Sequence, residues 1–285
     1  MIKLLLSFVL ASLFTLTCSL PLDTISERGL SNKVDEYGDK FEGDMVLTQE
    51  QIEAIFSPAR NGLILEKYRW PNKTVAYQLN ANHTKEQQDF IEIALKKLES
   101  VSCLKFVRRT NEEKFVNLTA YDEGCYSSVG YQNKTQRLNL QKYKPGTGCF
   151  RLGTIMHEFL HALGFYHMQS AHDRDEYVTI HWGNIRSGYE HNFAKFNNTE
   201  VTNFNTTYDY GSVMHYSAYG FSKNGNATIV PVDESFLGKI GQREKLSEKD
   251  IFKLNTMYEC DAPEPEPEAG INSADESVVP HFLIS

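Results

Sequence analysis

Three histidines and one glutamate in the middle of the chain have the spacing of a catalytic metal site. In the run H-E-F-L-H, His157 and His161 are four residues apart, so a helix would place both imidazoles on one face. Zinc favours imidazole nitrogen, and Gly164 can end the helix so that His167 approaches from a third direction. Three neutral ligands leave one coordination position open, and Glu158 is placed to take a proton from a water bound there. The alternative, a core helix with incidental histidines, does not account for the glycine and the third histidine.

A second short motif, S-V-M-H-Y, lies further along the chain and contains Met214 and Tyr216. A methionine between polar residues is by itself ordinary core filling. After the pattern H-E-x-x-H-x-x-G-x-x-H, however, it matches the Met-turn that underlies the zinc in metzincins. With these two motifs the chain resembles the astacin family over roughly residues 61–260. Further matching segments are R-W-P at 69–71, S-C-L-K-F at 102–106, G-C-Y-S at 124–127, D-R-D at 173–175 and G-Q-R at 241–243.

The resemblance implies an α+β fold, the astacin-like metzincin fold. This is a mixed, twisted sheet with two long helices above an irregular C-terminal lobe, with the active-site cleft between them. Residues 125–129 would then lie at the edge of the cleft, where a substrate strand can pair with them. The resemblance also implies that Tyr216 is a switchable zinc ligand, which swings away when substrate binds and donates to the oxyanion.

The motif F-E-G-D, which ends at Asp44, is the signature expected of a pro-segment. On charge alone Asp44 is one more solvated acid. Astacin pro-segments carry F-x-G-D with the aspartate on the zinc, so the resemblance implies that Asp44 is a metal ligand in the zymogen only. Glu42 is expected to make no such contribution. Cleavage after Arg60 by a trypsin-like protease would make Asn61 the new N-terminus and release the inhibitory segment.

Two positions depart from the astacin pattern. The residue after the third histidine is Met168, where the family usually has glutamate, and Ala171 stands where an arginine is usual. The glutamate of the relatives contacts the new N-terminus after activation. Neither position is a zinc ligand or the general base.

The first residues have the features of a secretory signal peptide. Lys3 precedes an apolar run over 4–16, and small residues follow. A membrane anchor is the alternative, but the run falls short of the roughly 20 residues that span a bilayer. The mature protein is therefore expected to be secreted and extracellular, with no stable membrane insertion.

The cysteines and glycosylation motifs agree with that compartment. Removing Cys18 with the signal peptide leaves four cysteines, which indicates two disulfides with three possible pairings. The resemblance implies the pairs Cys103–Cys260 and Cys125–Cys149. Seven N-x-S/T motifs predict a glycoprotein. Their asparagines are Asn72, Asn82, Asn117, Asn133, Asn197, Asn205 and Asn226.

The net charge of -8 is unevenly distributed. Residues 261–285 contribute -6 and residues 1–60 contribute -4, which leaves +2 for 61–260. The central region has no stripe of basic residues, so nucleic acid is not an expected partner. We expect a signal peptide at 1–19, a pro-segment at 20–60, a catalytic domain at 61–260 and a disordered Pro/Glu-rich tail at 261–285.

Periodicity predicts the elements that would position these residues. A half-buried strand is expected around Val75, Tyr77 and Leu79, followed by a helix that opens with a Thr84/Gln87 capping box. Strands are expected at 104–108, 115–121 and 137–141, the metal-binding helix at 152–163, and little regular structure over 168–245. Ser247 and Asp250 would cap the last helix.

The sequence therefore predicts a secreted zinc endopeptidase, a hydrolase that cuts internal peptide bonds and is made as a zymogen. It would carry one Zn²⁺ per chain, act on proteins or peptides, and be a monomer. The alternative is a secreted zinc-binding glycoprotein that lacks catalysis, but such a protein has no need of Glu158.

Overall fold

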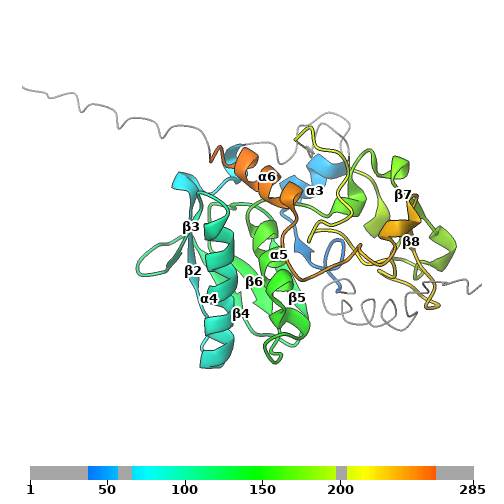
Figure 1. The fold of residues 1–285 in the computed structure, drawn as a ribbon. Coiled ribbons are helices and arrows are strands. Elements are labelled where there is room, and N and C mark those ends of the chain that lie inside the picture. Colours follow the sequence, from blue (N-terminus) through cyan, green and yellow to red (C-terminus); the bar gives the residue numbers. More distant parts are fainter. Residues whose placement is uncertain (1–37, 57–65, 197–203, 261–285) are drawn as a thin grey trace, which may run out of the picture.

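The computed structural model describes residues 38–56, 66–196 and 204–260 (Figure 1). The predicted signal peptide, the predicted cleavage site at Arg60 and Asn61, and the acidic tail lie outside these ranges. The α-helices in the described ranges are α3 (Gln49–Phe56), α4 (Lys85–Ser100), α5 (Leu152–Ala162) and α6 (Glu248–Met257). The strands are β1 (Met45–Val46), β2 (Thr74–Gln78), β3 (Lys105–Arg108), β4 (Val116–Thr119), β5 (Cys125–Ser128), β6 (Gln136–Leu140), β7 (Val178–Ile180) and β8 (Ile229–Pro231).

Six strands form one mixed sheet in the order β1-β5-β6-β4-β2-β3. Strands β3, β2, β4 and β6 are parallel, β5 is antiparallel to β6, and β1 is parallel to β5. In β2 the alternating residues Val75 and Tyr77 are buried as predicted, but Ala76 between them is buried too. The strand is therefore covered on both faces, and the prediction of a half-buried strand is wrong at this position.

The two long helices, α4 and α5, lie side by side on one face of this sheet, as predicted (Figure 1). Helix α4 begins with the expected capping box between Thr84 and Gln87. Its buried face consists of Ile91, Ala94, Leu95 and Leu98, which follow the i, i+3, i+4, i+7 spacing of an amphipathic helix. Helix α5, by contrast, is almost entirely buried from Gly153 to Ala162, because the sheet, α4 and the C-terminal lobe enclose it.

Helix α5 ends one residue earlier than predicted, and its end directs the chain back toward the cluster of histidines. Gly164 has φ +108°, a conformation that a side chain would strain. Its N–H donates to the carbonyl of His161, and the N–H of Phe165 donates to the carbonyl of Leu160. These two hydrogen bonds form a Schellman motif, which satisfies carbonyls at the helix end and reverses the chain before His167.

Two disulfides join the ends of the domain and brace the sheet. The structure pairs Cys103 with Cys260 and Cys125 with Cys149, which are the pairs that the resemblance implied. The first joins cysteines that are 157 positions apart and ties the segment just after α6 to the start of β3. The second ties β5 to the turn that precedes α5, and so connects the edge of the sheet to the histidine-bearing helix.

The C-terminal lobe is not wholly irregular, contrary to prediction. Strands β7 and β8 form an antiparallel pair, with Thr179 opposite Val230. The short helical turns of the lobe lie at 168–170, 174–176, 182–184, 190–193 and 234–236. The lobe has its own core, which includes Phe193, Tyr216 and Phe221. Aromatic contacts between distant loops form this core, so no regular spacing along the sequence predicts it.

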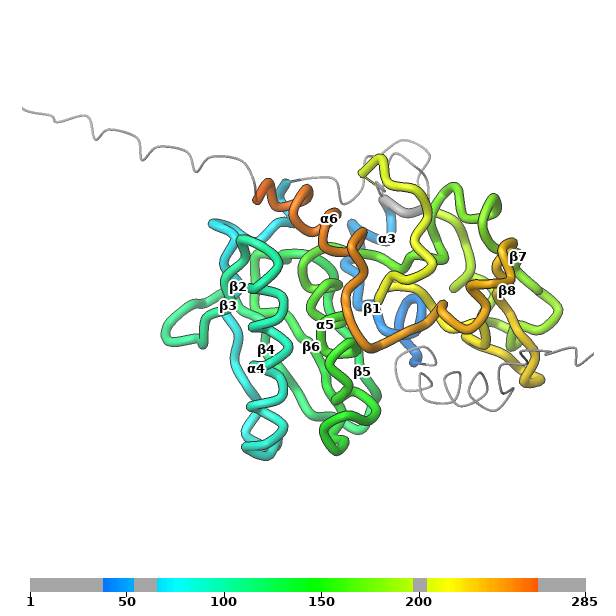
Figure 2. Tube along the Cα trace, viewed as in Figure 1, coloured from blue at the N-terminus to red at the C-terminus, as the bar shows by residue number. Residues whose placement is uncertain are grey.

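Segment 38–56 lies between the two lobes, where Figure 2 shows it beside the lobe of β7 and β8. Phe41 and Met45 exchange backbone hydrogen bonds and so close a tight loop over Glu42, Gly43 and Asp44. Glu42 and Gly43 both have positive φ, at 45° and 86°. This loop is anchored on both sides, since the N–H of Ser127 donates to the Asp44 carbonyl and the N–H of Glu42 donates to the side chain of Asn192.

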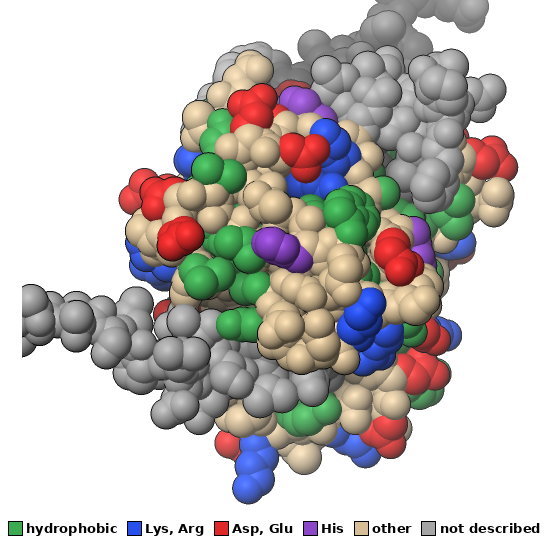
Figure 3. Space-filling model, turned by 90° about the vertical axis from the view of Figure 1, so that its right-hand side faces the viewer, with side chains coloured by type: hydrophobic (Ala, Val, Ile, Leu, Met, Phe, Trp, Pro, Cys, Tyr) green, Lys and Arg blue, Asp and Glu red, His purple; other side chains and the backbone are tan. Residues whose placement is uncertain are grey.

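The surface carries mixed charges. On the face shown in Figure 3, the described Lys and Arg side chains are scattered among acidic and apolar ones. Five asparagines of the glycosylation motifs are exposed: Asn72, Asn82, Asn133, Asn205 and Asn226. Asn117, on β4, is half-buried. Within the described ranges, the helices are too short or too polar to cross a membrane.

Candidate metal centre

Three histidines and one aspartate converge between the lobes. One ligand atom from each of Asp44, His157, His161 and His167 lies within 4.8 Å of the others, and all four residues are buried. The Asp44 carboxylate lies 3.0 Å from His157 Nε2, 3.4 Å from His161 Nε2 and 3.2 Å from His167 Nε2. His157 Nε2 is in turn 3.1 Å from His161 Nε2 and 3.3 Å from His167 Nε2.

The opposite ring nitrogens decide which way the lone pairs point. Each Nδ1 has an acceptor at 2.8 Å: the Val213 carbonyl for His157, the Phe165 carbonyl for His161 and the Glu42 carboxylate for His167. When Nδ1 of a neutral ring donates a hydrogen bond, the proton is on Nδ1 and the lone pair is on Nε2. In each of these rings that lone pair points toward the centre. Three such lone pairs cannot satisfy one another, whereas a cation that prefers nitrogen and carboxylate oxygen satisfies them all. The donor set therefore fits Zn²⁺.

Buried carboxylates set the electrostatics of this centre. Burial lowers the pKa of His157 and His161, so both imidazoles favour the neutral form that binds metal. Burial opposes the charge on Asp44, but attraction to His167 and His161 outweighs it and holds the pKa of this carboxyl well below its usual range. Burial also opposes a charge on His167, yet Asp44 and Glu42 raise its pKa to about 9. The two carboxylates make the centre favourable for a positive charge.

Glu42 lies at this centre, although no sequence pattern places it there. Its carboxylate is 2.8 Å from His167 Nδ1 and accepts from the Ser170 hydroxyl at 2.7 Å. Its backbone carbonyl accepts a hydrogen bond from the Tyr216 hydroxyl. Glu42 is not among the residues that can hold the metal, but it contacts the third histidine of the cluster. The tight loop over 42–44 turns both carboxylates inward, and the sequence does not show that turn.

Glu158, Met214 and Tyr216 each lie next to, or contact, a residue of the segments that carry the histidines. Glu158 is fully buried on α5, next to the first histidine of the cluster. The carbonyl of Met214 accepts from the N–H of Met168, which ties the predicted Met-turn to the residue after the third histidine. The ring of Tyr216 lies 4.8 Å from the His167 ring, and its hydroxyl is held by segment 38–56.

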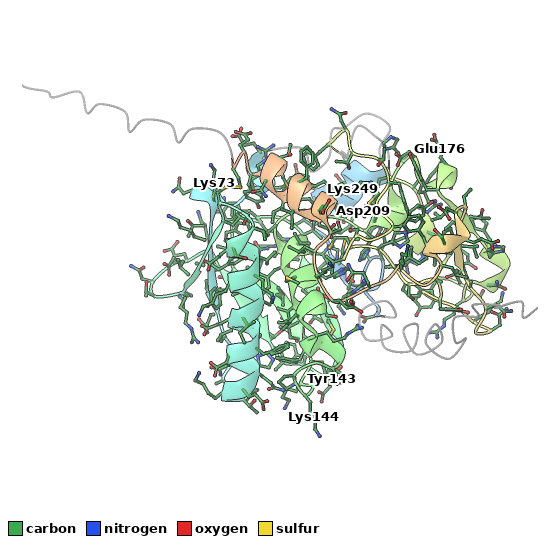
Figure 4. All side chains as sticks on the ribbon, viewed as in Figure 1. Lys73, Tyr143, Lys144, Glu176, Asp209 and Lys249 are labelled. Atoms are coloured by element: carbon green, nitrogen blue, oxygen red, sulfur yellow. A yellow bond between two sulfur atoms is a disulfide. The ribbon has the colours of Figure 1, made fainter. Side chains whose placement is uncertain are left out.

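Asp250 supports the centre from helix α6, a role that the sequence did not suggest beyond capping. Its carboxylate accepts from the Ser212 hydroxyl at 2.6 Å and from the N–H of Val213 at 2.9 Å. The Val213 carbonyl is the acceptor for His157 Nδ1. Figure 4 shows Asp209 and Lys249 beside this end of α6, where Asp209 also accepts from the Ser247 hydroxyl. One buried carboxylate thus fixes the loop that orients a histidine of the cluster.

We expect Asp250→Ala to lower the free energy of unfolding by about 3 kcal/mol, because several buried donors lose their acceptor. Urea denaturation of the full chain, with disulfides intact, measures this loss. Asp122→Ala, which removes an exposed carboxylate, is the matched control and should change stability by less than about 0.5 kcal/mol. Equal stability of the two variants would show that Asp250 does not hold this loop.

Comparison with known proteins accounts for this arrangement. The family model described as Astacin, a family of peptidases, matches residues 63–259. The chain belongs to the astacin family. It is 43% identical over 218 residues to Seminal metalloprotease 1 of Drosophila melanogaster, and the match covers 74% of this chain and 86% of that protein. It is also 40% identical over 236 residues to Protein SpAN of Strongylocentrotus purpuratus.

Among solved structures, the chain resembles High choriolytic enzyme 1, a hatching enzyme zinc-protease from Oryzias latipes. The TM-score is 0.61 at 36% identity, and the match covers 67% of this chain and 93% of the other. The chain spans only 38% of the length of Protein SpAN, although the match covers 78% of this chain. Astacins are zinc proteases, and the buried group of one aspartate and three histidines can hold this ion.

The departure at Met168 has a clear setting within this astacin domain. Met168 is buried, and its sulfur lies 3.4 Å from the ammonium of Lys253, which is also buried. Burial lowers the pKa of Lys253. At the position where the family pattern led us to expect glutamate, a thioether thus faces a basic group.

Proposed function

We propose that this chain is a secreted zinc endopeptidase, made as a zymogen in which segment 38–56 blocks the active site. The observation that carries the proposal is the buried cluster of three histidine Nε2 atoms beside Glu158, closed by the Asp44 carboxylate. We assign the metal to His157, His161 and His167, with Asp44 as a further ligand before cleavage. Two disulfides and the exposed glycosylation motifs support secretion.

The proposed reaction is hydrolysis of an internal peptide bond. When bound, zinc polarises the scissile carbonyl and lowers the pKa of the attacking water. Glu158 takes a proton from that water and later delivers it to the leaving amine, so one carboxylate acts as base and then as acid. The Tyr216 hydroxyl donates to the developing oxyanion once it is released from the Glu42 carbonyl.

Latency follows from where segment 38–56 lies. The Asp44 carboxylate lies among the three histidines, where it would take the coordination position that the attacking water needs, and β1 pairs with β5 along the edge where a substrate strand would bind. Cleavage after Arg60 would turn the tethered inhibitor into a peptide that can dissociate. A trypsin-like protease is the proposed activator, and the mature protein is proposed to act as a monomer.

The test is casein cleavage by the full chain before and after trypsin treatment, with a parallel zinc assay. The proposal expects latency first, activity after trypsin, one zinc per chain, and loss of activity with a chelator that zinc restores. The rival function is a secreted zinc-binding glycoprotein without catalysis. It would bind zinc equally but show no cleavage after trypsin, and that result would overturn the proposal.

We expect Tyr216→Phe to lower kcat of the activated chain by about 10–100-fold, with a smaller change in KM. The variant deletes only the hydroxyl, and the proposed role of this group is to donate in the transition state. Steady-state kinetics on one fluorogenic peptide separates the two constants. Tyr219→Phe, another tyrosine of the C-terminal lobe, is the matched control. A raised KM with unchanged kcat would make Tyr216 a binding residue only.

A further inference from the structure

An apolar pocket next to the metal centre holds a side chain of segment 38–56. Met45 follows Asp44 directly and is 1% exposed. It packs in one buried cluster with Tyr68, Val129, Tyr166 and Phe196, and we call these four residues the Met45 pocket. The rings of Tyr166 and Phe196 meet edge to face with their centroids 4.9 Å apart.

The walls of the Met45 pocket are bonded to the catalytic domain, although Val129 also exchanges hydrogen bonds with Val46 and Gln51, and Phe196 stacks on Phe41. Next to Val129, the N–H of Gly130 donates to the carbonyl of His161. The Tyr68 carbonyl accepts from the N–H of Tyr131, and Tyr166 directly precedes His167. These bonds lie outside segment 38–56, so we expect them to hold the walls in place when the segment leaves.

The pocket would then face solvent with three aromatic side chains and one valine beside the metal centre. Covering exposed apolar area of this kind is energetically favourable. Met45 covers it in this structure, and Met45 belongs to strand β1. The backbone of that strand pairs with β5 through Met45 opposite Ser127 and Val46 opposite Ser128. A peptide that pairs with β5 in the register of β1 would direct one of its alternating side chains into the same pocket.

We propose that the Met45 pocket is a substrate subsite that takes one large apolar side chain, such as Met, Leu or Phe. This side chain lies within two residues of the scissile bond, on the side whose backbone pairs with β5. The interval follows from Asp44, whose side chain reaches the metal centre while Met45 fills the pocket. The proposal rests on the proposed endopeptidase function and adds the class of substrate to it.

The experiment profiles cleavage of a mixed peptide library by the full chain after activation with trypsin and inhibition of the trypsin. Cuts made by the identically treated Glu158→Gln chain are subtracted as background. The expected result is one position within two residues of the cut at which large apolar side chains are favoured at least about tenfold over Asp and Lys. The other positions nearby should show weaker apolar selection.

Two variants of the pocket test the assignment. Val129→Asp places a carboxylate in the wall, so the preferred side chains at that position should change from apolar to Lys and Arg. Val129→Ala enlarges the pocket with less risk to folding, and it should raise the ratio of Phe to Leu at the same position. Val232→Asp is the matched control, since Val232 is 62% exposed in the C-terminal lobe, and its profile should equal that of the parent chain.

The outcomes separate this inference from the proposed function. A parent chain that cuts no peptide after activation overturns both. A parent chain that cuts many peptides without apolar selection, or a Val129→Ala profile identical to the parent, overturns the subsite and leaves the endopeptidase in place. Selection at one position that changes in Val129→Ala supports the subsite, whether or not Val129→Asp folds.

Discussion

Glu158→Gln should retain the full zinc content of the chain. After trypsin activation its turnover of a peptide substrate should be lower by a factor of about 10²–10⁴. Glutamine has the shape of glutamate but cannot accept and return a proton. Glu158 is fully buried on α5 and contributes none of the atoms that converge on the metal, so the metal should stay. Zinc analysis and kinetics on the same preparation measure both quantities.

The matched control is Glu86→Gln, which makes the same chemical change on the exposed first turn of α4. It should keep both zinc and turnover. Near-normal turnover of Glu158→Gln would mean that another group is the base. Loss of zinc from this variant would instead mean that Glu158 holds the metal site together, and the mechanism proposed above would be wrong.

Asp44→Ala should make the uncleaved chain an active peptidase. The carboxylate contacts all three histidines and is the one group of segment 38–56 among the four residues that can hold the metal. Its removal opens a coordination position without any cut. The test is peptidase activity in a chain that also carries Arg60→Ala, which prevents cleavage at the proposed site. We expect activity to rise at least about tenfold above that of the Arg60→Ala chain, corresponding to about 1.4 kcal/mol of blocking free energy.

Glu42→Ala should give a smaller rise than Asp44→Ala in the same assay. Glu42 holds segment 38–56 to His167 and Ser170 but leaves the Asp44 carboxylate in place. Asp39→Ala removes an exposed acid of the same segment and is the control that should stay latent. Full latency of Asp44→Ala would mean that the segment blocks the cleft by bulk alone, and Asp44 would have no part in it.

The local elements were predictable because their signals lie within one or two turns of chain. The capping boxes that open α4 and α6 need only residues three apart, and both are present as predicted. The spacing of His157 and His161 needs only one helical turn, and α5 contains both. The antiparallel pair β7 and β8 was missed, since its two strands are separated by nearly fifty residues and each has only three.

The sequence by itself determined the ligand types, the helix that carries two of them and the family to which the chain belongs. Residue chemistry and short spacings are properties of a chain segment, and they do not depend on what packs against it. Only the tertiary structure decided that Glu42 reaches His167, that Asp250 orients His157 through Val213, and that Met45 fills an apolar pocket. Each of these contacts joins segments far apart in the chain, so their geometry arises only in the folded protein.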